Sequence, residues 1–229
     1  MKVAVMQPYL FPYLGYYQLA KCVDTLVLYD DVNYIPRGYI NRNYILYQGR
    51  KWRFTVPVMG ASIHKKIYTL SFSRNVSGVL QSIRHAYSKA PYFDAVFPMV
   101  EEVLEREDRD ITDMCSSGIR EVLDYLEIGT PLLRSSRMEY NKHPGRSQNL
   151  MEICSSLGAC EYVNSPGGRL IYDKKEFSSC GYNLSFLEPR EVHYNQGKNE
   201  FVPNLSMIDV LMWCSKDQAM ALLDEYDIV

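Results

Sequence analysis

Near its N-terminus the chain reads Val3-Ala4-Val5-Met6, followed by Gln7-Pro8-Tyr9-Leu10-Phe11-Pro12-Tyr13-Leu14-Gly15-Tyr16-Tyr17-Gln18-Leu19. The short apolar run is typical of a buried strand, and we expect a helix to start near Leu14. Ligands of open α/β sheets bind outside the carboxyl ends of strands. A helix N-terminus there offers unpaired N–H groups to an anion, and tyrosines offer stacking surface and hydroxyls. The segment therefore predicts a site for a base, a sugar or a phosphate.

The rest of the chain continues an α/β pattern. A second apolar run, residues 25–29, follows the first helix and has the spacing of a strand–helix–strand unit. Helical periodicity over residues 75–126 predicts two or three helices. Further strands are expected at 52–56, 67–71, 130–134 and 161–164, and further helices at 147–157 and after Ser206. We predict a single α/β domain over residues 1–229. Its expected form is a three-layer, Rossmann-like arrangement with a mostly parallel sheet and a helical insertion at about 75–126.

The composition of the chain argues against several classes of function. The chain has 229 residues, 47% of them apolar, which suffices for one sizeable core. Its formal net charge of −2 lacks the basic excess of general nucleic-acid binders, so we do not expect DNA as a partner. No stretch is long and apolar enough to span a bilayer. Met1-Lys2 runs straight into the first strand without a signal segment, which favours the cytoplasm. The scattered histidines and cysteines predict no metal site.

One polar and aromatic region stands out as a candidate site. Nine of the nineteen tyrosines lie in the first 47 residues, more than a core needs. The same region carries the polar residues Asp30, Asp31, Asn33, Arg37, Asn41, Arg42 and Asn43. The two aspartates end a strand, which suits a ribose contact or acid–base work, but equally a turn cap. The two arginines suit a phosphate or carboxylate, although a surface loop held by local hydrogen bonds gives the same pattern.

Two later segments are weaker candidates. The first is the segment Asn164-Ser165-Pro166-Gly167-Gly168-Arg169 at the end of an expected strand, whose glycines would let a ligand approach the backbone closely. A plain turn explains the same residues equally well. Residues 201–206 precede the last helical region and are more typical of capping and packing. No phosphate-binding glycine loop and no local catalytic triad motif occurs.

Several of these pieces together resemble the WbqC-like protein family along nearly the whole chain. The matching pieces, in order, are residues 6–16, 29–32, 37–43, 55–58, 87–93, 165–168 and 201–209. The resemblance implies an association with bacterial surface-polysaccharide and O-antigen biosynthesis. It also implies glycine transfer to an amino sugar, the role suggested for the family.

A second likeness concerns the first strand and helix alone. Gln7-Pro8 followed by Tyr13-Leu14-Gly15-Tyr16 is similar in layout to the H-x-G-H signature of nucleotidyltransferases and class I aminoacyl-tRNA synthetases. Tyr13 and Tyr16 stand at the histidine positions, and neutral tyrosines do not supply imidazole contacts to a triphosphate. The likeness therefore implies a Rossmann-like fold with a nucleotide-shaped site. Such a site suits a sugar nucleotide or the acceptor end of an aminoacyl-tRNA.

We therefore predict a transferase of surface-polysaccharide precursor biosynthesis, moving an aminoacyl group such as glycyl to the amine of a nucleotide-linked amino sugar. Asp30 or Asp31 is the expected general base, and Asn41 and Asn43 the expected donors to the carbonyl oxygen. The expected substrate-binding residues are Gln7, Tyr9, Tyr13, Gly15, Tyr16, Arg37, Arg42, Ser165, Gly167, Gly168 and Arg169.

The donor side and the alternatives stay open at this point. No cofactor is predicted, and the activated donor is ATP-derived or a charged tRNA. One alternative is a nucleotidyltransferase with an altered signature, which would need a divalent metal and release pyrophosphate. The other is a noncatalytic protein that binds a sugar nucleotide. The sequence leaves the oligomeric state open.

Overall fold

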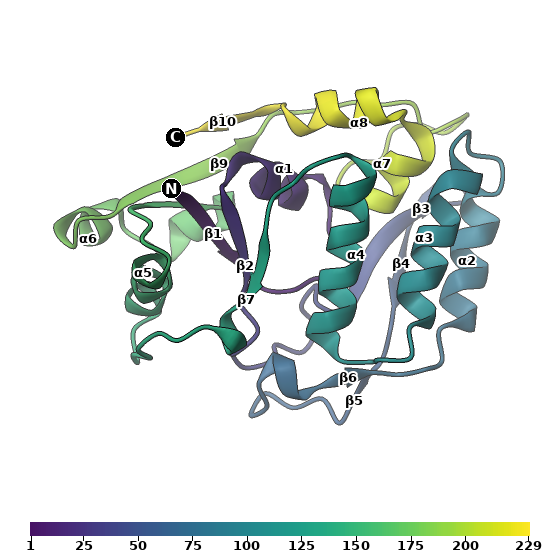
Figure 1. Ribbon diagram of the computed structural model, residues 1–229. Helices are drawn as coiled ribbons and strands as arrows, with labels where there is room; N and C mark the ends of the chain where they lie inside the picture. The colour runs from purple at the N-terminus through teal and green to yellow at the C-terminus, as the bar shows by residue number, and fades with distance from the viewer.

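A computed structural model describes all residues, 1–229, and shows a mixed α/β protein (Figure 1). Its central sheet has six strands in the order β10-β9-β8-β1-β2-β7. The strands are β1 (Lys2–Met6), β2 (Thr25–Leu28), β7 (Leu132–Arg134), β8 (Glu161–Asn164), β9 (Asn183–Pro189) and β10 (Tyr226–Ile228). All neighbours are parallel except β9 and β10. The prediction of a mostly parallel sheet compatible with a Rossmann-like fold is confirmed.

The strand order places a topological switch beside β1. The chain adds β2 and β7 on one side of β1, and then returns to add β8, β9 and β10 on the other. Val3 of β1 therefore faces Thr25 of β2 on one side and Tyr162 of β8 on the other. A crevice forms at the carboxyl ends of the strands where the winding direction changes. The carboxyl ends of β1 and β8, and the loops that follow them, thus define the expected ligand position.

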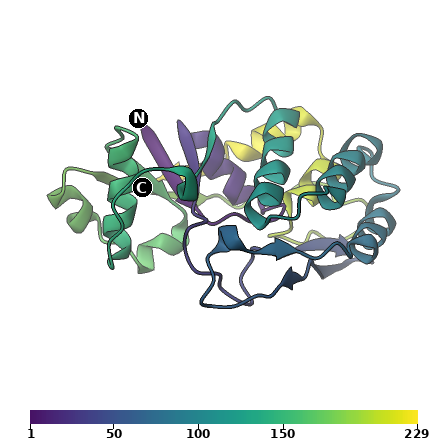
Figure 2. The ribbon, with the colours of Figure 1, turned by 60° about the horizontal axis from the view of Figure 1, so that its bottom comes forward.

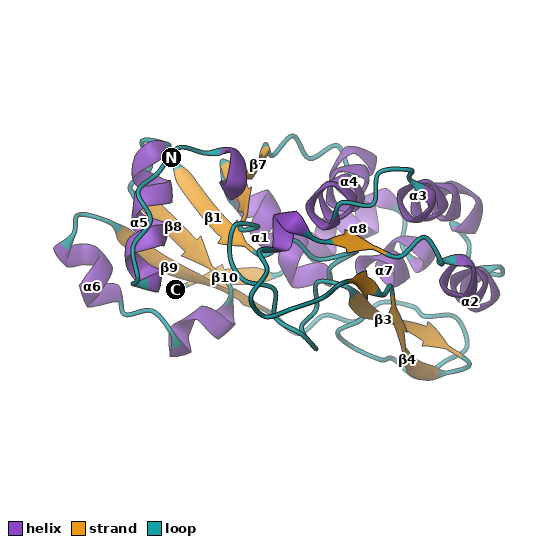
Figure 3. Cartoon of the chain, turned by 90° about the horizontal axis from the view of Figure 1, so that it is seen from below, coloured by secondary structure: helices purple, strands orange, loops and turns teal.

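Alternating side chains of the sheet enter two hydrophobic clusters. Val3, Val5 and Val27 pack in a cluster with α5 (Arg146–Ser156) and α6 (Lys174–Ser179), which lie beside β8 and β9 in Figure 3. Ala4 and Leu26 belong to a larger cluster of 47 buried residues. That cluster includes α1 (Leu14–Cys22), α7 (Met207–Trp213) and α8 (Lys216–Leu223). The three-layer arrangement itself stays a prediction.

Three helices lie between the small strand β6 (Ser71–Phe72) and β7. They are α2 (Ser77–Tyr87), α3 (Phe93–Glu105) and α4 (Ile111–Tyr125). The side chain of Asp110 caps α4 by accepting a hydrogen bond from the N–H of Asp113 at 2.9 Å. The predicted helices of this region are confirmed, whereas their description as an insertion into a single domain stays a prediction. None of the helices has both the length and the apolar character that crossing a bilayer requires.

Small strands fill the segment between β2 and α2, seen in blue in Figure 2. β3 (Arg42–Tyr47) and β4 (Arg50–Thr55) form a hairpin, while β5 (Val58–Met59) pairs with β6. Gln48 and Gly49 turn the hairpin with positive φ angles of 52° and 72°, which suits a tight two-residue turn. The prediction of a strand at 67–71 is wrong, because Ile67–Thr69 form a 3₁₀ turn and only Ser71 of this range belongs to a strand.

Candidate functional site

The first of two cavities lies at the switch point, and we call it the switch-point cleft. It has a volume of about 530 Å³ and is lined by residues of the β1–α1 loop, the β3–β4 hairpin and the loop after β8. Four tyrosines line it, namely Tyr9, Tyr13, Tyr39 and Tyr44, together with Lys51 and residues 165–167. The cleft therefore occupies the place that the strand order indicates for a ligand.

The cleft combines aromatic surface with one positive charge. The rings of Tyr9 and Tyr39 lie 6.1 Å apart, and the Lys51 Nζ lies 4.5 Å from the centre of the Tyr44 ring. Burial raises the pKa values of Tyr9 and Tyr13, so that their phenols stay protonated and able to donate hydrogen bonds. Stacking surface, hydroxyl donors and an ammonium group suit a ligand with a ring system and a phosphate.

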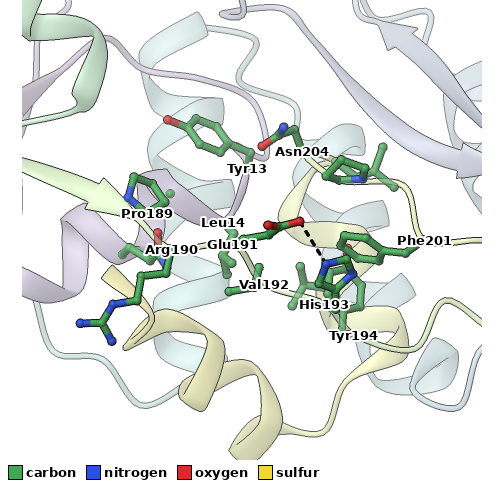
Figure 4. A pocket seen from close by; sticks show the side chains of 15 residues that line it. Tyr13, Leu14, Pro189, Arg190, Glu191, Val192, His193, Tyr194, Phe201 and Asn204 are labelled. Atoms are coloured by element: carbon green, nitrogen blue, oxygen red, sulfur yellow. Dashed lines mark hydrogen bonds and ion pairs between the residues drawn. The ribbon is translucent and has the colours of Figure 1, made fainter. Parts of the chain in front are cut away.

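The second cavity, which we call the α1–β9 cavity, lies on the other side of Tyr13. Its volume is about 590 Å³, and its walls are the start of α1, residues 189–194 after β9, and residues 201–205 (Figure 4). Glu191 and His193 approach each other here, with 3.2 Å between Oε1 and Nε2. The His193 ring also lies 4.5 Å from the ring of Phe201. The cavity thus carries a carboxylate–imidazole pair.

Tyr13 and Asn204 line both cavities and separate them. Asn204 has a left-handed backbone with φ of 56°, and no hydrogen bond from its side chain occurs within the chain. Tyr13 forms an isolated antiparallel bridge with Ser206. The Ser206 hydroxyl and the Asn43 amide donate to the carbonyl of Phe11 at 2.7 and 2.5 Å. Segments from both ends of the chain therefore hold this divider in place.

A buried carboxylate is hydrogen-bonded to Tyr194, one of the residues that line the α1–β9 cavity. Asp209 of α7 is fully buried and accepts hydrogen bonds from Tyr87 (2.6 Å), Tyr194 (2.7 Å) and Gln196 (2.8 Å). Burial raises the pKa of Asp209 more than these three donors lower it. Because Tyr194 lines the cavity, this network couples α2 and α7 to the shape of the cavity.

Six of the predicted site residues line at least one of the cavities: Tyr9, Tyr13, Gly15, Asn43, Ser165 and Gly167. Gly15 has a steric reason to be glycine, because a Cβ there would lie 2.6 Å from Cε2 of Tyr13. Both polar atoms of the Asn43 side chain are engaged, since its amide donates to Phe11 and its carbonyl accepts from the N–H of Tyr44. Asn43 therefore lines the cleft mainly as a scaffold.

Asp30 and Asp31 line neither cavity. Asp30 is fully buried and pairs with Arg134 (Oδ2 to Nε, 3.0 Å) and with the N–H and hydroxyl of Ser136. Asp31 accepts from the Ser135 hydroxyl, from Tyr140 and from Lys142. Burial alone would raise the pKa of Asp31, but these hydrogen bonds outweigh it and hold the pKa below its usual range. Both carboxylates are thus occupied in joining β2 to the segment after β7.

The remaining predicted residues also lie outside both cavities. Tyr16 is fully buried in the core and donates to the carbonyl of Gln7 at 3.1 Å. Asn41 donates to the carbonyl of Val56, and Arg169 forms an ion pair with Glu188 at 2.7 Å.

Three others complete this group: Arg37, Arg42 and Gly168. Arg37 is exposed with φ of 63°, Arg42 begins β3, and Gly168 is buried against the Asn164 side chain. Neither of the two arginines makes an ion pair. The functional roles of all these residues stay predictions.

Sequence reasoning missed several residues that the fold brings to the cavities: Tyr39, Tyr44, Lys51, Glu191, His193 and Asn204. The signal available for Asn204 was its place in the motif at 201–206, which we interpreted as capping. The capping is real, because Ser206 accepts from the N–H of Ile208 at 3.3 Å. Nothing in the local sequence marks Lys51 or His193. No group of three or more His, Cys, Asp or Glu side chains gathers in a way that could hold a metal ion.

Comparison with known proteins gives two matches, and each of them extends over nearly the whole chain. The model of the WbqC-like protein family matches residues 7–221 of the chain. An uncharacterized protein of Mycobacterium tuberculosis, Rv1507c, is 28% identical over 216 residues, which cover 92% of each chain. No solved structure matches the chain.

Proposed function

The chain belongs to the WbqC-like protein family, and on that premise we propose that it is a group transferase of surface-polysaccharide precursor synthesis. In this proposal it transfers an aminoacyl group, glycyl in the first instance, to the amine of a nucleotide-linked amino sugar. The substrate classes come from what the family resemblance implies. The arrangement of the two cavities supports the reaction type.

The observation that carries the proposal is that Tyr13 and Asn204 line both cavities. A transferase must hold two substrates with their reacting atoms in contact, and this positioning supplies much of its rate enhancement. Two cavities of similar volume that meet at Tyr13 and Asn204 place two substrates side by side, and the reaction requires their reacting atoms to meet past these two side chains. A protein that only binds one sugar nucleotide would need the switch-point cleft alone.

In the proposal, the switch-point cleft takes the nucleotide-linked amino sugar. Tyr9 and Tyr39 offer rings for stacking, and Lys51 offers a charge for the phosphates. The loop of residues 165–167 offers backbone groups close to the ligand. This assignment replaces the predicted phosphate contacts of Arg37, Arg42 and Arg169 by Lys51, because those arginines lie outside the cleft.

The α1–β9 cavity takes the activated aminoacyl donor. The neutral amine of the sugar attacks the acyl carbon, forming a C–N bond while the bond from that carbon to the leaving group breaks. The proton of the amine passes to the Glu191–His193 pair, the carboxylate–imidazole pair that lines this cavity. The free amide of Asn204 donates to the developing oxyanion. We place these roles here because Asp30, Asp31, Asn41 and Asn43 have their polar atoms engaged elsewhere.

The test is mass spectrometry of a panel of nucleotide-linked amino sugars incubated with the protein, glycine, ATP and a charged-tRNA mixture. A sugar nucleotide heavier by one glycyl unit is the expected product, and omission of ATP or of tRNA identifies the donor. Saturable binding of one panel member without any product would instead indicate a noncatalytic binding protein. Release of pyrophosphate with a new nucleotide-linked product would indicate nucleotidyl transfer.

A matched pair of variants tests the wall. Asn204→Gly keeps the left-handed backbone and removes the amide, so turnover should fall about 100-fold or more, as for loss of an oxyanion donor. The control is Gln48→Gly, the same kind of change at an amide residue with φ of 52° in the β3–β4 turn. It should leave turnover unchanged. Equal turnover in both variants would remove Asn204 from the mechanism.

A further inference from the structure

Gln18 of α1 carries a buried acceptor without a donor. The residue is fully buried, and it lines the α1–β9 cavity. Its Nε2 donates to the carbonyls of Leu222 (3.0 Å) and Glu225 (2.9 Å). These two acceptors determine the orientation of the amide, since a flipped amide would set its oxygen against two carbonyl oxygens. The Oε1 is therefore assigned, and no group of the chain donates to it.

An unsatisfied buried acceptor destabilises a fold, and native proteins rarely keep one without a reason. Because Gln18 lines a cavity, a bound molecule with an N–H or O–H group can satisfy it. A second acceptor lies in the same cavity. The Glu191 side chain is 87% exposed and contacts His193 through Oε1, so its Oε2 is open to solvent and to a ligand in the cavity. Two acceptors, one of them charged, favour a ligand that carries an ammonium group.

The cavity also presents donors. Leu14 and Gly15 are the first two residues of the nine-residue helix α1, and both line the cavity. The Leu14 N–H points to the carbonyl of Leu205 in the bridge between Tyr13 and Ser206, whereas the Gly15 N–H has no acceptor in the chain, as expected in a first turn without a side-chain cap. Helix N-termini favour negatively charged or polarised oxygen atoms. Arg190 also lines the cavity, but its guanidinium group is already paired with Asp227 and Glu225.

We propose that the α1–β9 cavity is a binding site for the amino-acid part of a substrate. The ammonium group donates to the Gln18 Oε1 and to the Glu191 carboxylate, and the carboxyl or acyl oxygen accepts from the N–H group of Gly15. Binding of an amino acid here does not require that the amino acid is transferred. The assignment of this site to the acyl donor, however, rests on the proposed function. It then orients the acyl carbon toward the wall formed by Tyr13 and Asn204.

The test is ligand-observed NMR on the full chain with three probes. Glycine has both charged groups, glycinamide keeps only the ammonium, and N-acetylglycine keeps only the carboxylate. We expect glycine and glycinamide to bind and N-acetylglycine to bind at least about fivefold more weakly, because its amide N–H carries no positive charge to pair with the Glu191 carboxylate. Equal binding of N-acetylglycine, or no binding of glycine and glycinamide, would overturn the proposal.

Variants locate the site. Glu191→Gln should weaken glycinamide binding about fivefold, the loss expected for an exposed charge. The control Glu200→Gln, on the same segment but outside the cavity, should leave binding unchanged. Gln18→Met, judged only if its circular dichroism spectrum is native, should weaken binding about tenfold. If Glu191→Gln binds glycinamide as tightly as the unchanged protein, the site is not this cavity.

The experiments can refute the amino-acid binding site and the proposed glycyl transfer independently of each other. Amine binding that depends on Glu191, without product from any sugar nucleotide, would uphold the site and refute the proposed function. Glycyl transfer with an unchanged KM for the donor in Glu191→Gln would uphold the function and refute the site.

Discussion

The substitution Asp209→Leu tests whether the buried carboxylate organises the wall of the α1–β9 cavity. Asp209 accepts from the hydroxyls of Tyr87 and Tyr194 and from the Gln196 amide. The Gln196 amide keeps a second acceptor in the carbonyl of Val202 at 3.0 Å. The two tyrosine hydroxyls have no other acceptor, so leucine would leave two donors unsatisfied.

The magnitude follows from that count. Each unsatisfied buried donor costs about 1–3 kcal/mol, so Asp209→Leu should lower the free energy of unfolding by about 2–6 kcal/mol. In a chain of this length about 1 kcal/mol corresponds to about 2–4 °C in Tm, so a loss near the middle of that range lowers Tm by about 8–16 °C. Asp209→Asn retains one acceptor oxygen and should cost about half as much.

Urea unfolding followed by circular dichroism measures these differences. The decisive comparison adds Tyr194→Phe to Asp209→Leu. Removing the unsatisfied hydroxyl should restore about 1–3 kcal/mol, although Tyr194→Phe alone destabilises the unchanged protein. If the double variant is no more stable than Asp209→Leu, the unsatisfied-donor explanation is wrong and the loss comes from packing.

Three further predictions concern the cleft, the wall and acid stability. Lys51→Met should raise the KM for a sugar nucleotide about tenfold by removing a charge-assisted phosphate contact, while the exposed control Lys89→Met leaves steady-state kinetics unchanged. Gly15→Ala would set its Cβ 2.6 Å from the ring that divides the cavities, so turnover should fall while circular dichroism stays native. The pKa of Asp31 is lowered in the fold, so its stabilisation is present above the unfolded pKa of about 3.9 and is lost as pH falls through the folded pKa. Tyr140→Phe removes one of the hydrogen bonds that lower this pKa, and urea midpoints between about pH 2 and pH 6 should then fall at a higher pH than in the unchanged protein.

The first strand and helix show how much of the fold could be predicted from local pattern. The apolar run 3–6 is β1, and the helix expected near Leu14 begins there. The helix expected at 147–157 is α5 at Arg146–Ser156. Such elements depend on periodicity over a few residues, which the sequence displays directly. The β3–β4 hairpin was missed because its alternation is hidden among arginines, asparagines and tyrosines that also suit a loop.

The aspartates after β2 show the limit of that reasoning. Their position at a strand's carboxyl end was predicted, but whether they face a ligand depends on residues about a hundred positions away. Asp30 pairs with Arg134 and Asp31 with Ser135, partners separated by 104 residues in each case. A carboxylate engaged by such partners is satisfied within the fold and does not need a substrate group as a partner.

The amino-acid sequence alone therefore established the family resemblance and the parallel α/β character, and it predicted the loop after β1 as the place for a ligand. Hydrophobic periodicity and motif order carry that information, because they are properties of neighbouring residues. Tertiary structure alone decided which polar side chains face the cavities. It joined Tyr13 to Asn204 across almost two hundred residues and left the Gln18 acceptor without a donor. Those outcomes depend on long-range packing and on the pairing of buried polar groups, which no local pattern encodes.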